Sequence, residues 1–254
     1  MANKLNGTVA LVTGASSGIG EATAHALAEQ GAAVAVVARR KDRLEQLAAQ
    51  ITAKGGRVLV IEADVTDKDQ AQSAVEKTVK ELGQLDILIN NAGVMLLGPI
   101  IDAPVEEWER MVELNQLGLL YTAHAALPHL LKAAETSERK VADLVNISSV
   151  AGRRATAGSG IYNMTKFGVN AFSEALRQEI TGRHVRVSLV EPGAVKTELS
   201  SHIRAEIREQ AMQRFADIER LESEDIADAI QYIVTRSRRV AINELLIRPT
   251  EQVG

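Results

Sequence analysis

Tyr162 and Lys166 stand four residues apart and could together move a proton. On a helix, side chains at positions i and i+4 lie on one face, so the phenol and the ammonium group could share one environment. A phenol ordinarily has a pKa of about 10. A nearby cation favours the phenolate and lowers that pKa toward neutrality, where proton exchange is efficient. The spacing therefore predicts a general acid/base at Tyr162, with a surface pair on an amphipathic helix as the alternative.

A glycine-rich turn near the N-terminus could bind a phosphate. The apolar run 8–12 leads into Thr13-Gly-Ala-Ser-Ser-Gly-Ile-Gly20, and a helical pattern follows. Gly14 would permit the tight turn, Gly18 would let the backbone approach a pyrophosphate, and Gly20 would let the helix pack on the strand. The helix N-terminus would offer free N–H groups and its positive dipole end. The turn predicts a dinucleotide site, with an ordinary loop of small residues as the alternative.

Two arginines bear on which dinucleotide would bind. The second apolar run ends Val36-Val37-Ala38-Arg39-Arg40 and carries no carboxylate. A carboxylate there would bind a ribose 2′-hydroxyl, whereas an arginine accommodates a 2′-phosphate. Arg39 could stack on the adenine and pair with that phosphate. We therefore predict NADP(H) over NAD(H), with solvated arginines at a strand end as the alternative.

These residues need elements to position them, and the pattern of the chain supplies them. Short apolar runs, typical of buried parallel strands, alternate with helical patterns. The predicted strands are 8–12, 33–37, 57–61, 85–89, 144–147, 185–190 and 244–247. The predicted helices end near Gln30 or span about 41–54, 67–82 (with Thr66 as N-cap), 105–131, 162–180 and 223–235 (with Ser223 as N-cap). The alternation predicts a doubly wound parallel sheet, a Rossmann fold of three α/β/α layers in one domain, 1–254.

Composition limits the class of protein. The 254 residues include 46% apolar residues, only 3% aromatic residues and no cysteine, and the formal net charge is −4. The charge is too mild for a nucleic-acid surface, and disulfides and thiolate metal sites are excluded. No run is apolar for long enough to span a bilayer, and the N-terminus does not read as a signal peptide. We therefore expect a cytoplasmic protein with no nucleic-acid or membrane partner.

The motifs occur together in one order and spacing. They are Thr13-Gly-Ala-Ser-Ser-Gly-Ile-Gly20, Asn90-Asn-Ala-Gly93, Ser149, Tyr162-Asn-Met-Thr-Lys166 and Pro192-Gly193. With these motifs the chain resembles the short-chain dehydrogenase/reductase family over nearly its whole length. Residues 93–99, 166–177 and 247–252 are similar to an NADP-preferring bacterial group of that family that includes clavulanic acid dehydrogenase (clavaldehyde reductase).

The resemblance implies a role for each motif residue. The catalytic set would be Asn115, Ser149, Tyr162 and Lys166. Ser149 would polarise the substrate oxygen, Lys166 would also bind the nicotinamide ribose, and Asn115 would bend its helix and hold a water beside Lys166. The cofactor-binding set would be Gly14, Ser16, Ser17, Gly18, Ile19, Gly20, Arg39, Arg40, Asp64, Val65, Asn90, Asn91, Ala92, Gly93, Tyr162, Lys166, Pro192, Gly193, Val195 and Thr197.

Other residues concern the substrate and the pocket walls. Ser148 rivals Ser149 but would point to the opposite side of its strand. Met164 stands where the family has a small residue and could alter packing on the substrate side. Met95, Leu96 and Val150 are candidate apolar walls. The loop 153–160 is expected to line the pocket, and the polar segment 196–220 could be a flap over it. The five histidines have no spacing that suggests a metal site.

We therefore predict an NADPH-dependent oxidoreductase, acting on CH–OH groups, that reversibly reduces an aldehyde or ketone. One alternative is an NAD-dependent alcohol dehydrogenase. A second, from another class, is a dinucleotide-binding sensor without catalysis. The family resemblance also implies a homotetramer with the helices 105–131 and 162–180 at one interface.

Overall fold

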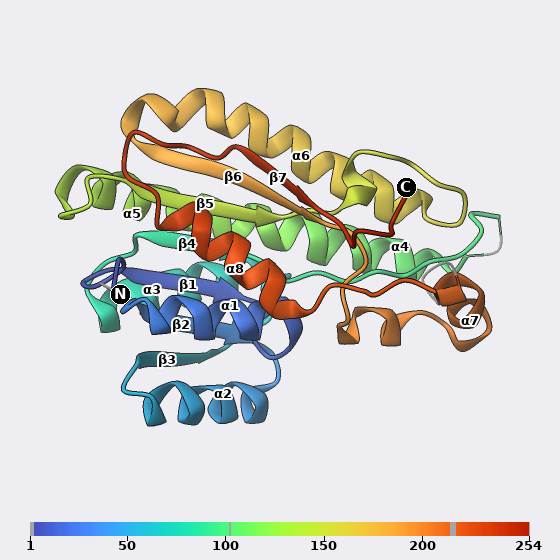
Figure 1. Ribbon diagram of the computed structural model, residues 1–254, viewed down its shortest axis with the longest axis horizontal. Coiled ribbons are helices and arrows are strands. Elements are labelled where there is room, and N and C mark those ends of the chain that lie inside the picture. The colour runs from blue at the N-terminus through green and yellow to red at the C-terminus, as the bar shows by residue number, and fades with distance from the viewer. Residues whose placement is uncertain (1–2, 102, 214–216, 254) are drawn as a thin grey trace.

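The computed structural model describes residues 3–101, 103–213 and 217–253 of the chain. Within them, seven parallel strands form one sheet in the order β3-β2-β1-β4-β5-β6-β7 (Figure 1). The strands are β1 (Val9–Thr13), β2 (Ala33–Ala38), β3 (Arg57–Glu62), β4 (Ile87–Asn90), β5 (Ala142–Ile147), β6 (Val185–Pro192) and β7 (Glu244–Ile247).

Helices cover both faces of the sheet (Figure 1). On one face lie α1 (Gly18–Glu29), α2 (Lys41–Ala53) and α8 (Ser223–Val234). On the other lie α3 (Lys68–Leu82), α5 (Leu119–Thr136) and α6 (Gly160–Ile180). Side chains of one strand alternate between the two cores: Ala10 and Val12 of β1 pack with the first set of helices, and Leu11 packs with the second. The predicted doubly wound, three-layer domain is confirmed.

The order of the strands creates a crevice at one edge of the sheet. The chain winds outward from β1 through β2 to β3, then crosses to β4 on the other side of β1 and continues to β7. In such sheets ligands bind beyond the carboxyl ends of the strands, where the winding reverses. The reversal falls between β1 and β4, so the residues after these two strands are placed to meet a ligand.

The predicted helix starts need two corrections. Asp67, not Thr66, caps α3: its carboxylate accepts hydrogen bonds from the backbone N–H groups of Asp69 and Gln70. The Thr66 hydroxyl instead donates to Asp64. Glu222, not Ser223, caps α8, in a capping box with Asp225. In both cases a carboxylate takes the place predicted for a hydroxyl, because it can accept from more than one of the free N–H groups.

The stretch predicted as one helix over 105–131 is longer and is interrupted. It consists of α4 (Val105–Val112), a π-helical turn η1 (Glu113–Gly118) and α5, which ends at Thr136. π-helical turns distort a helix locally and often mark functional positions. Asn115 lies within η1, so the local distortion predicted at this residue is present.

Two findings limit the kinds of site in the described part of the chain. None of its helices combines the length and apolar character needed to cross a bilayer. Nor do three or more of its histidine, aspartate or glutamate side chains gather where they could hold a metal ion.

Candidate active site

A cavity of about 830 Å³ runs along the carboxyl edge of the sheet. Each of the seven strands contributes residues to its lining at or just after the strand's end: Gly14, Arg39, Asp64, Asn91, Ser149, Gly193 and Arg248. The loop after β5 and the start of the predicted flap also line it. The cavity therefore extends across the whole crevice predicted by the strand order.

The glycine-rich turn forms one part of the wall. Gly14 and Gly18 have positive φ angles of 65° and 59°, which side chains with a Cβ rarely adopt. Ser17 precedes α1 but makes no capping bond to it, and its hydroxyl instead accepts from Arg40. The first N–H groups of α1 therefore have no side-chain cap, and Gly18 and Ile19 line the cavity. This arrangement suits an anion at the helix N-terminus.

Gly20 does not line the cavity but fixes how α1 meets the turn. A Cβ added here would lie 2.4 Å from the Gly14 carbonyl oxygen and 2.5 Å from the Asn91 amide nitrogen. Asn91 holds the turn by donating to the carbonyl oxygens of Thr13 and Gly14. Gly20 therefore allows the close packing predicted for it, without being a contact residue.

We expect Gly20→Ala to destabilise the protein by about 2–3 kcal/mol, because backbone atoms must move to admit the methyl group. Urea unfolding measures this loss. Gly182→Ala is the matched control: no heavy atom lies within 4 Å of its added Cβ, and its φ is not positive. Equal stabilities of the two variants would contradict the close contact at Gly20.

Arginines after β2 form a basic end of the cavity. Arg40 donates to the Ser16 and Ser17 hydroxyls and pairs with Glu198 at 2.8 Å. Arg39 is mostly exposed and lies 3.5 Å from the Asp64 carboxylate. The pKa of Asp64 is lowered overall, because hydrogen bonds from Thr66 and the charge of Arg39 outweigh partial burial. Hydrogen bonding from Arg40 likewise lowers the pKa of Glu198.

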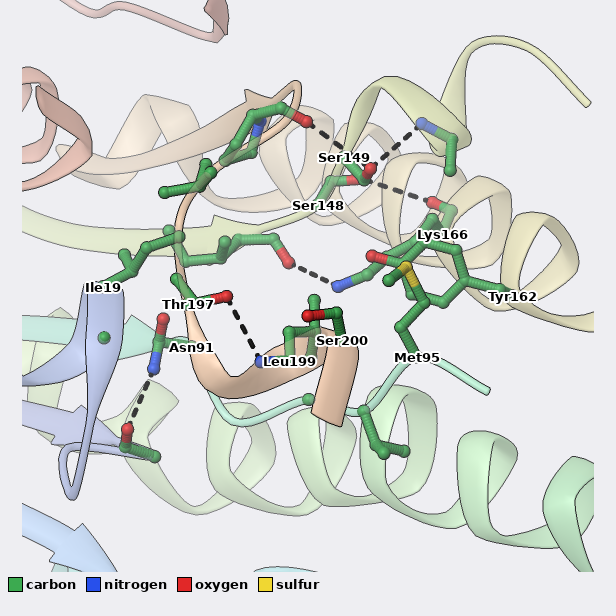
Figure 2. Close-up of a pocket in the computed structure, with 18 of the residues that line it drawn as sticks. Ile19, Asn91, Met95, Ser148, Ser149, Tyr162, Lys166, Thr197, Leu199 and Ser200 are labelled. Carbon is green, nitrogen blue, oxygen red and sulfur yellow. Dashed lines mark hydrogen bonds between the residues drawn. The ribbon is translucent and has the colours of Figure 1, made fainter. Parts of the chain in front are cut away.

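Ser149, Tyr162 and Lys166 meet on the other side of the reversal point (Figure 2). Ser149 follows β5, while Tyr162 and Lys166 lie in the first turns of α6; both of these side chains are buried. The Lys166 Nζ donates to the carbonyl oxygen of Ile147 at 2.9 Å and lies 5.8 Å from the centre of the Tyr162 ring. The Ser149 hydroxyl hydrogen-bonds with the phenol. Three polar groups thus converge on one part of the cavity.

Ser148 also lines the cavity, but its hydroxyl is engaged elsewhere. It donates to the Asn170 side-chain oxygen at 2.5 Å and approaches the Lys166 carbonyl oxygen (Figure 2). Ser149, in contrast, accepts from the Ala151 N–H and contacts the phenol. Of the two serines, the geometry favours Ser149 as the partner of Tyr162.

Burial governs the pKa values at this end of the cavity. It raises the pKa of Tyr162 to about 12, with the Ser149 hydrogen bond acting in the lowering direction. It lowers the pKa of Lys166 to about 8. The pKa of the phenol is therefore shifted opposite to the direction predicted from the nearby lysine. The reason is that the site excludes water and the ammonium is itself destabilised there. In this state Tyr162 holds its proton at neutral pH.

Asn115 lies behind the cavity and does not line it. Its side-chain oxygen accepts from the Val94 N–H at 2.8 Å, and its amide donates to the Val94 carbonyl oxygen and the Thr165 hydroxyl. Thr165 precedes Lys166 on α6. Asn115 therefore joins the segment after β4 to the catalytic helix, which makes it a positioning residue and not a residue that contacts the cavity.

Most of the predicted cofactor-binding residues line the one cavity. They are Gly14, Ser16, Ser17, Gly18, Ile19, Arg39, Arg40, Asp64, Val65, Asn91, Ala92, Gly93, Tyr162, Lys166, Pro192, Gly193, Val195 and Thr197. Asn90 does not: it is buried in the sheet, where its amide donates to Asn146 and its oxygen accepts from Thr122. Asn90 and Gly20 therefore support the cavity from behind its lining, and contact of either with a cofactor stays a prediction.

The predictions for the walls are partly wrong. Met95 and Val150 line the cavity, but Leu96 is buried in a small apolar cluster and Leu97 lines the cavity in its place. Met164 is 48% exposed and is absent from the lining, so its volume does not act on the substrate side. Its position on α6 between Tyr162 and Lys166 turns it outward, because residues two apart on a helix face different directions.

The loop and flap predictions hold in part. Arg153, Arg154, Thr156 and Ser159 of the loop 153–160 line the cavity. In the segment 196–220, Glu198–His202 forms a short 3₁₀ helix (η4) that begins after Thr197, and Ala205–Gln213 forms α7. Several of its residues face the cavity, including Leu199 and Ser200 (Figure 2). Residues 214–216 of this segment lie outside the described residues. Its movement as a flap stays a prediction.

The C-terminal segment after β7 is the contribution that the sequence did not reveal. Arg248, Glu251, Gln252 and Val253 line the cavity. Gln252 accepts from the Ala194 N–H at 2.9 Å and would collide with a Cβ at Gly193. The residues after the other strands were expected to meet the ligand because they lie at the carboxyl edge of the sheet. The same reasoning could have predicted that the residues after β7 line the cavity.

A comparison with protein families agrees with this geometry. The family model for short chain dehydrogenases matches residues 8–208. An oxidoreductase of Staphylococcus aureus (strain MRSA252) is 38% identical over 245 residues, which are 96% of this chain and 98% of that protein. A glycine betaine reductase of Emericella nidulans is 39% identical over 98% of this chain, but the chain spans only 19% of that protein.

Solved structures give the same picture. The closed form of a serine dehydrogenase complexed with NADP⁺ has a TM-score of 0.88 and 32% sequence identity, with 97% of each chain covered. A metagenomic short-chain oxidoreductase in complex with NADP has a TM-score of 0.81 and 31% identity, covering 97% of this chain and 99% of that one.

Proposed function

The chain belongs to the short-chain dehydrogenase/reductase family, and from this premise we propose that it is an NADP(H)-dependent enzyme that interconverts a carbonyl group and an alcohol. The observation that carries the proposal is the convergence of Ser149, Tyr162 and Lys166 in a cavity whose other end is the glycine-rich turn. An oxidoreductase with a nicotinamide cofactor is what the family assignment supports; the direction, the preference for NADP(H) and the roles below are proposed.

The proposed chemistry follows from the protonation states. Bound cofactor supplies a hydride to the carbonyl carbon in reduction and accepts it in oxidation. Ser149 would donate a hydrogen bond to the substrate oxygen, which stabilises the negative charge that develops there. Tyr162 would transfer its proton to that oxygen, giving the alcohol. Lys166 would hold positive charge beside the resulting phenolate and favour the loss of the proton.

The residues of the cavity fit a phosphorylated dinucleotide. The uncapped N-terminus of α1 and the turn Gly14–Ile19 suit a pyrophosphate, and Lys166 is placed to bind a ribose. Arg39 and Arg40 would hold a 2′-phosphate, for which guanidinium groups are well suited. The Asp64 carboxylate is engaged by Arg39 and Thr66, so it is less available to bind a ribose 2′-hydroxyl.

We expect Arg39→Ala to weaken NADPH binding about tenfold and to change NADH binding much less, because one charge-assisted contact to the 2′-phosphate is lost. Fluorescence titration with each reduced cofactor measures both affinities. Arg183→Ala serves as control, since Arg183 pairs with Glu135 away from the cavity. Tighter binding of NADH than of NADPH, with no loss in the variant, would overturn the preference and favour the NAD-dependent alternative.

The activity itself is tested with a panel of small aldehydes, bulky ketones and β-keto esters, followed by the consumption of NADPH. Turnover of at least one class is expected. If the protein binds NADPH tightly but consumes it with none of the carbonyl compounds, the alternative of a non-catalytic sensor is favoured.

A homotetramer is a further part of the proposal. Met164 and Phe167 on α6 and Leu117 on η1 are large apolar side chains with a third or more of their surface exposed. These elements are neighbours, since Gln116 reaches the carbonyl oxygen of Thr165. Such a patch supports a contact between copies of the chain through these helices.

We expect Phe167→Asp to reduce the assembly to smaller species, because a charge would be buried at the contact. Light scattering after size exclusion measures the mass. Tyr232→Asp, which changes an equally exposed aromatic residue on α8, is the control. A tetramer in both variants, or a monomer in the wild type, would contradict the proposed contact.

We also propose a cytoplasmic location, which the absence of cysteine supports.

A further inference from the structure

Three arginines that line the cavity have no carboxylate partner among the described residues. Arg154, Arg220 and Arg248 make no ion pair with any residue in the described ranges, and no side-chain hydrogen bond of theirs is found there. The other guanidinium groups of the lining differ. Arg39 pairs with Asp64, Arg40 with Glu198, and Arg153 with both Glu191 and Glu244. The three free cations are therefore a distinct feature of this cavity.

Two of these arginines are anchored beside the reacting groups. The carbonyl oxygen of Arg154 accepts a hydrogen bond from the side chain of Asn163, the neighbour of Tyr162. The Cα of Arg248 lies 3.2 Å from the position of a Cβ added to Gly193. Gly193 follows Pro192, whose carbonyl oxygen is 3.5 Å from the Ser149 hydroxyl. The backbones of Arg154 and Arg248 thus lie against residues that neighbour Tyr162 and contact Ser149, and they come from two different segments.

Arg220 arrives from a third segment. It precedes Leu221, which forms a short parallel bridge with Val195 and donates its N–H to the carbonyl oxygen of Ala194. Ala194 directly follows Gly193, so this bridge holds the backbone next to Arg220 close to the end of β6. Three separate parts of the chain thus each contribute one of these arginines to the lining of the cavity.

Arg248 is too far from the place proposed for the 2′-phosphate to serve it. The glycine-rich turn follows β1 and Arg39 follows β2, whereas Arg248 follows β7. Five strand-to-strand steps separate β2 from β7, which at roughly 4.8 Å each is about 24 Å. The proposed 2′-phosphate site therefore leaves the charge of Arg248 unused.

The acidic residues of the lining do not neutralise these charges. Asp64 and Glu198 are paired with Arg39 and Arg40 at the phosphate end. Glu251 accepts a hydrogen bond from the backbone N–H of Glu219 and forms no ion pair with a described residue. Three guanidinium groups thus face one unpaired carboxylate. A concave site with such an excess of positive charge raises the local concentration of anions.

We propose that the substrate carries an anionic group, a carboxylate or a phosphate, which Arg154 and Arg248 bind while its carbonyl or hydroxyl group lies at Ser149 and Tyr162; Arg220 adds to the positive field of the cavity. This inference rests on the proposed function, because it takes the reacting end of the cavity as given. The guanidinium fork matches both kinds of oxyanion.

Matched substrates test the charge. Acetoacetate is compared with methyl acetoacetate, and hydroxyacetone phosphate with hydroxyacetone, in NADPH-consumption assays. We expect kcat/KM to be about tenfold or more higher for the anionic member of a pair, the usual size of one charge-assisted contact. The preference should shrink as salt rises, since Arg154 and Arg248 are exposed. A preference confined to the carboxylate pair, or to the phosphate pair, identifies the group. Neutral members used as well as the anions overturn the inference.

Variants test the residues. We expect Arg248→Gln and Arg154→Gln each to lower kcat/KM for the preferred anion about tenfold, through KM, and to leave the neutral partner unchanged. Arg238→Gln is the control: Arg238 is also exposed and unpaired within the described residues, but it precedes β7 at the opposite edge of the sheet. A loss for both members of a pair, or no loss for either, would count against the inference.

A binding measurement separates this inference from the proposed function. With NADP⁺ present, acetate or inorganic phosphate should raise the Tm of the wild type more than chloride at equal ionic strength, and Arg248→Gln should abolish that difference. If no carbonyl compound is turned over, the proposed function fails, while the Tm difference still supports an anion site. Turnover of neutral substrates without any Tm difference leaves the function standing and overturns the inference.

Discussion

Tyr162→Phe is expected to retain NADPH binding and to lose nearly all carbonyl reduction, by a factor of about 10³ in kcat. The phenol is buried, hydrogen-bonds with Ser149, and burial raises its pKa to about 12. It therefore carries a proton at neutral pH, and phenylalanine carries none. The ring keeps its place among the apolar neighbours Val94, Leu96 and Met111, so the cavity should keep its shape.

The measurement is single-turnover reduction beside fluorescence titration of NADPH. Tyr121→Phe is the matched control, because Tyr121 lies on α5 and does not line the cavity. A Tyr162→Phe variant with most of the wild-type rate would remove this residue from the mechanism. A variant that no longer binds NADPH would show instead that the phenol supports the fold of the cavity.

Lys166→Met is expected to reduce kcat by a smaller factor, about 10². It is also expected to change how stability depends on pH. Burial lowers the pKa of Lys166 to about 8 in the folded protein, against 10.5 as its ordinary value. Between these two pH values the unfolded chain binds more protons than the folded one, so the stability of the wild type rises with pH. Below pH 8 the folded protein bears the full cost of the buried charge.

The stability of the wild type relative to Lys166→Met should therefore rise by about 2–3 kcal/mol between pH 7 and pH 10. Urea unfolding without cofactor gives the values, and the exposed Lys54→Met is the control. A constant difference across this pH range would mean that Lys166 is not an ionised, buried group.

The two variants together separate chemistry from stability. Tyr162→Phe should be costly to the reaction and nearly neutral for the fold at pH 7, because the phenol and the phenyl ring are both uncharged there. Lys166 places an ammonium group where water is excluded, and burying that charge lowers the stability of the fold. Residues of this kind are expected at functional sites, where stability is exchanged for activity.

Much of the fold could be read from local patterns. The last strand, 244–247, was predicted with the bounds it has in β7, and the alternation of strands and helices determined the doubly wound sheet. Local patterns were weaker at the helix starts. Thr66 and Ser223 have the right residue type for an N-cap, but the neighbouring carboxylates of Asp67 and Glu222 compete for the same N–H groups and take that place.

The sequence did not predict which polar side chains are buried inside the protein and which line the cavity. Asn90 was predicted in the cofactor-binding set and Asn115 in the catalytic set, yet both lie inside the protein and bond to other segments. An amide serves a ligand and a buried backbone equally well, because it is both a donor and an acceptor. Met164 and Leu96 show the same limit: an apolar residue type does not say which side of its element faces the cavity.

Tyr162 and Lys166 show where the division lies. The sequence by itself determined that the two residues share a helix face and that a dinucleotide turn precedes them, because both depend on spacing along the chain. Only the tertiary structure decided that this face is buried, so that the phenol keeps its proton and the ammonium is destabilised. It also decided that Arg154, Arg220 and Arg248 line the same cavity. These outcomes depend on segments far apart in the chain packing together, and spacing along the chain carries no information about that.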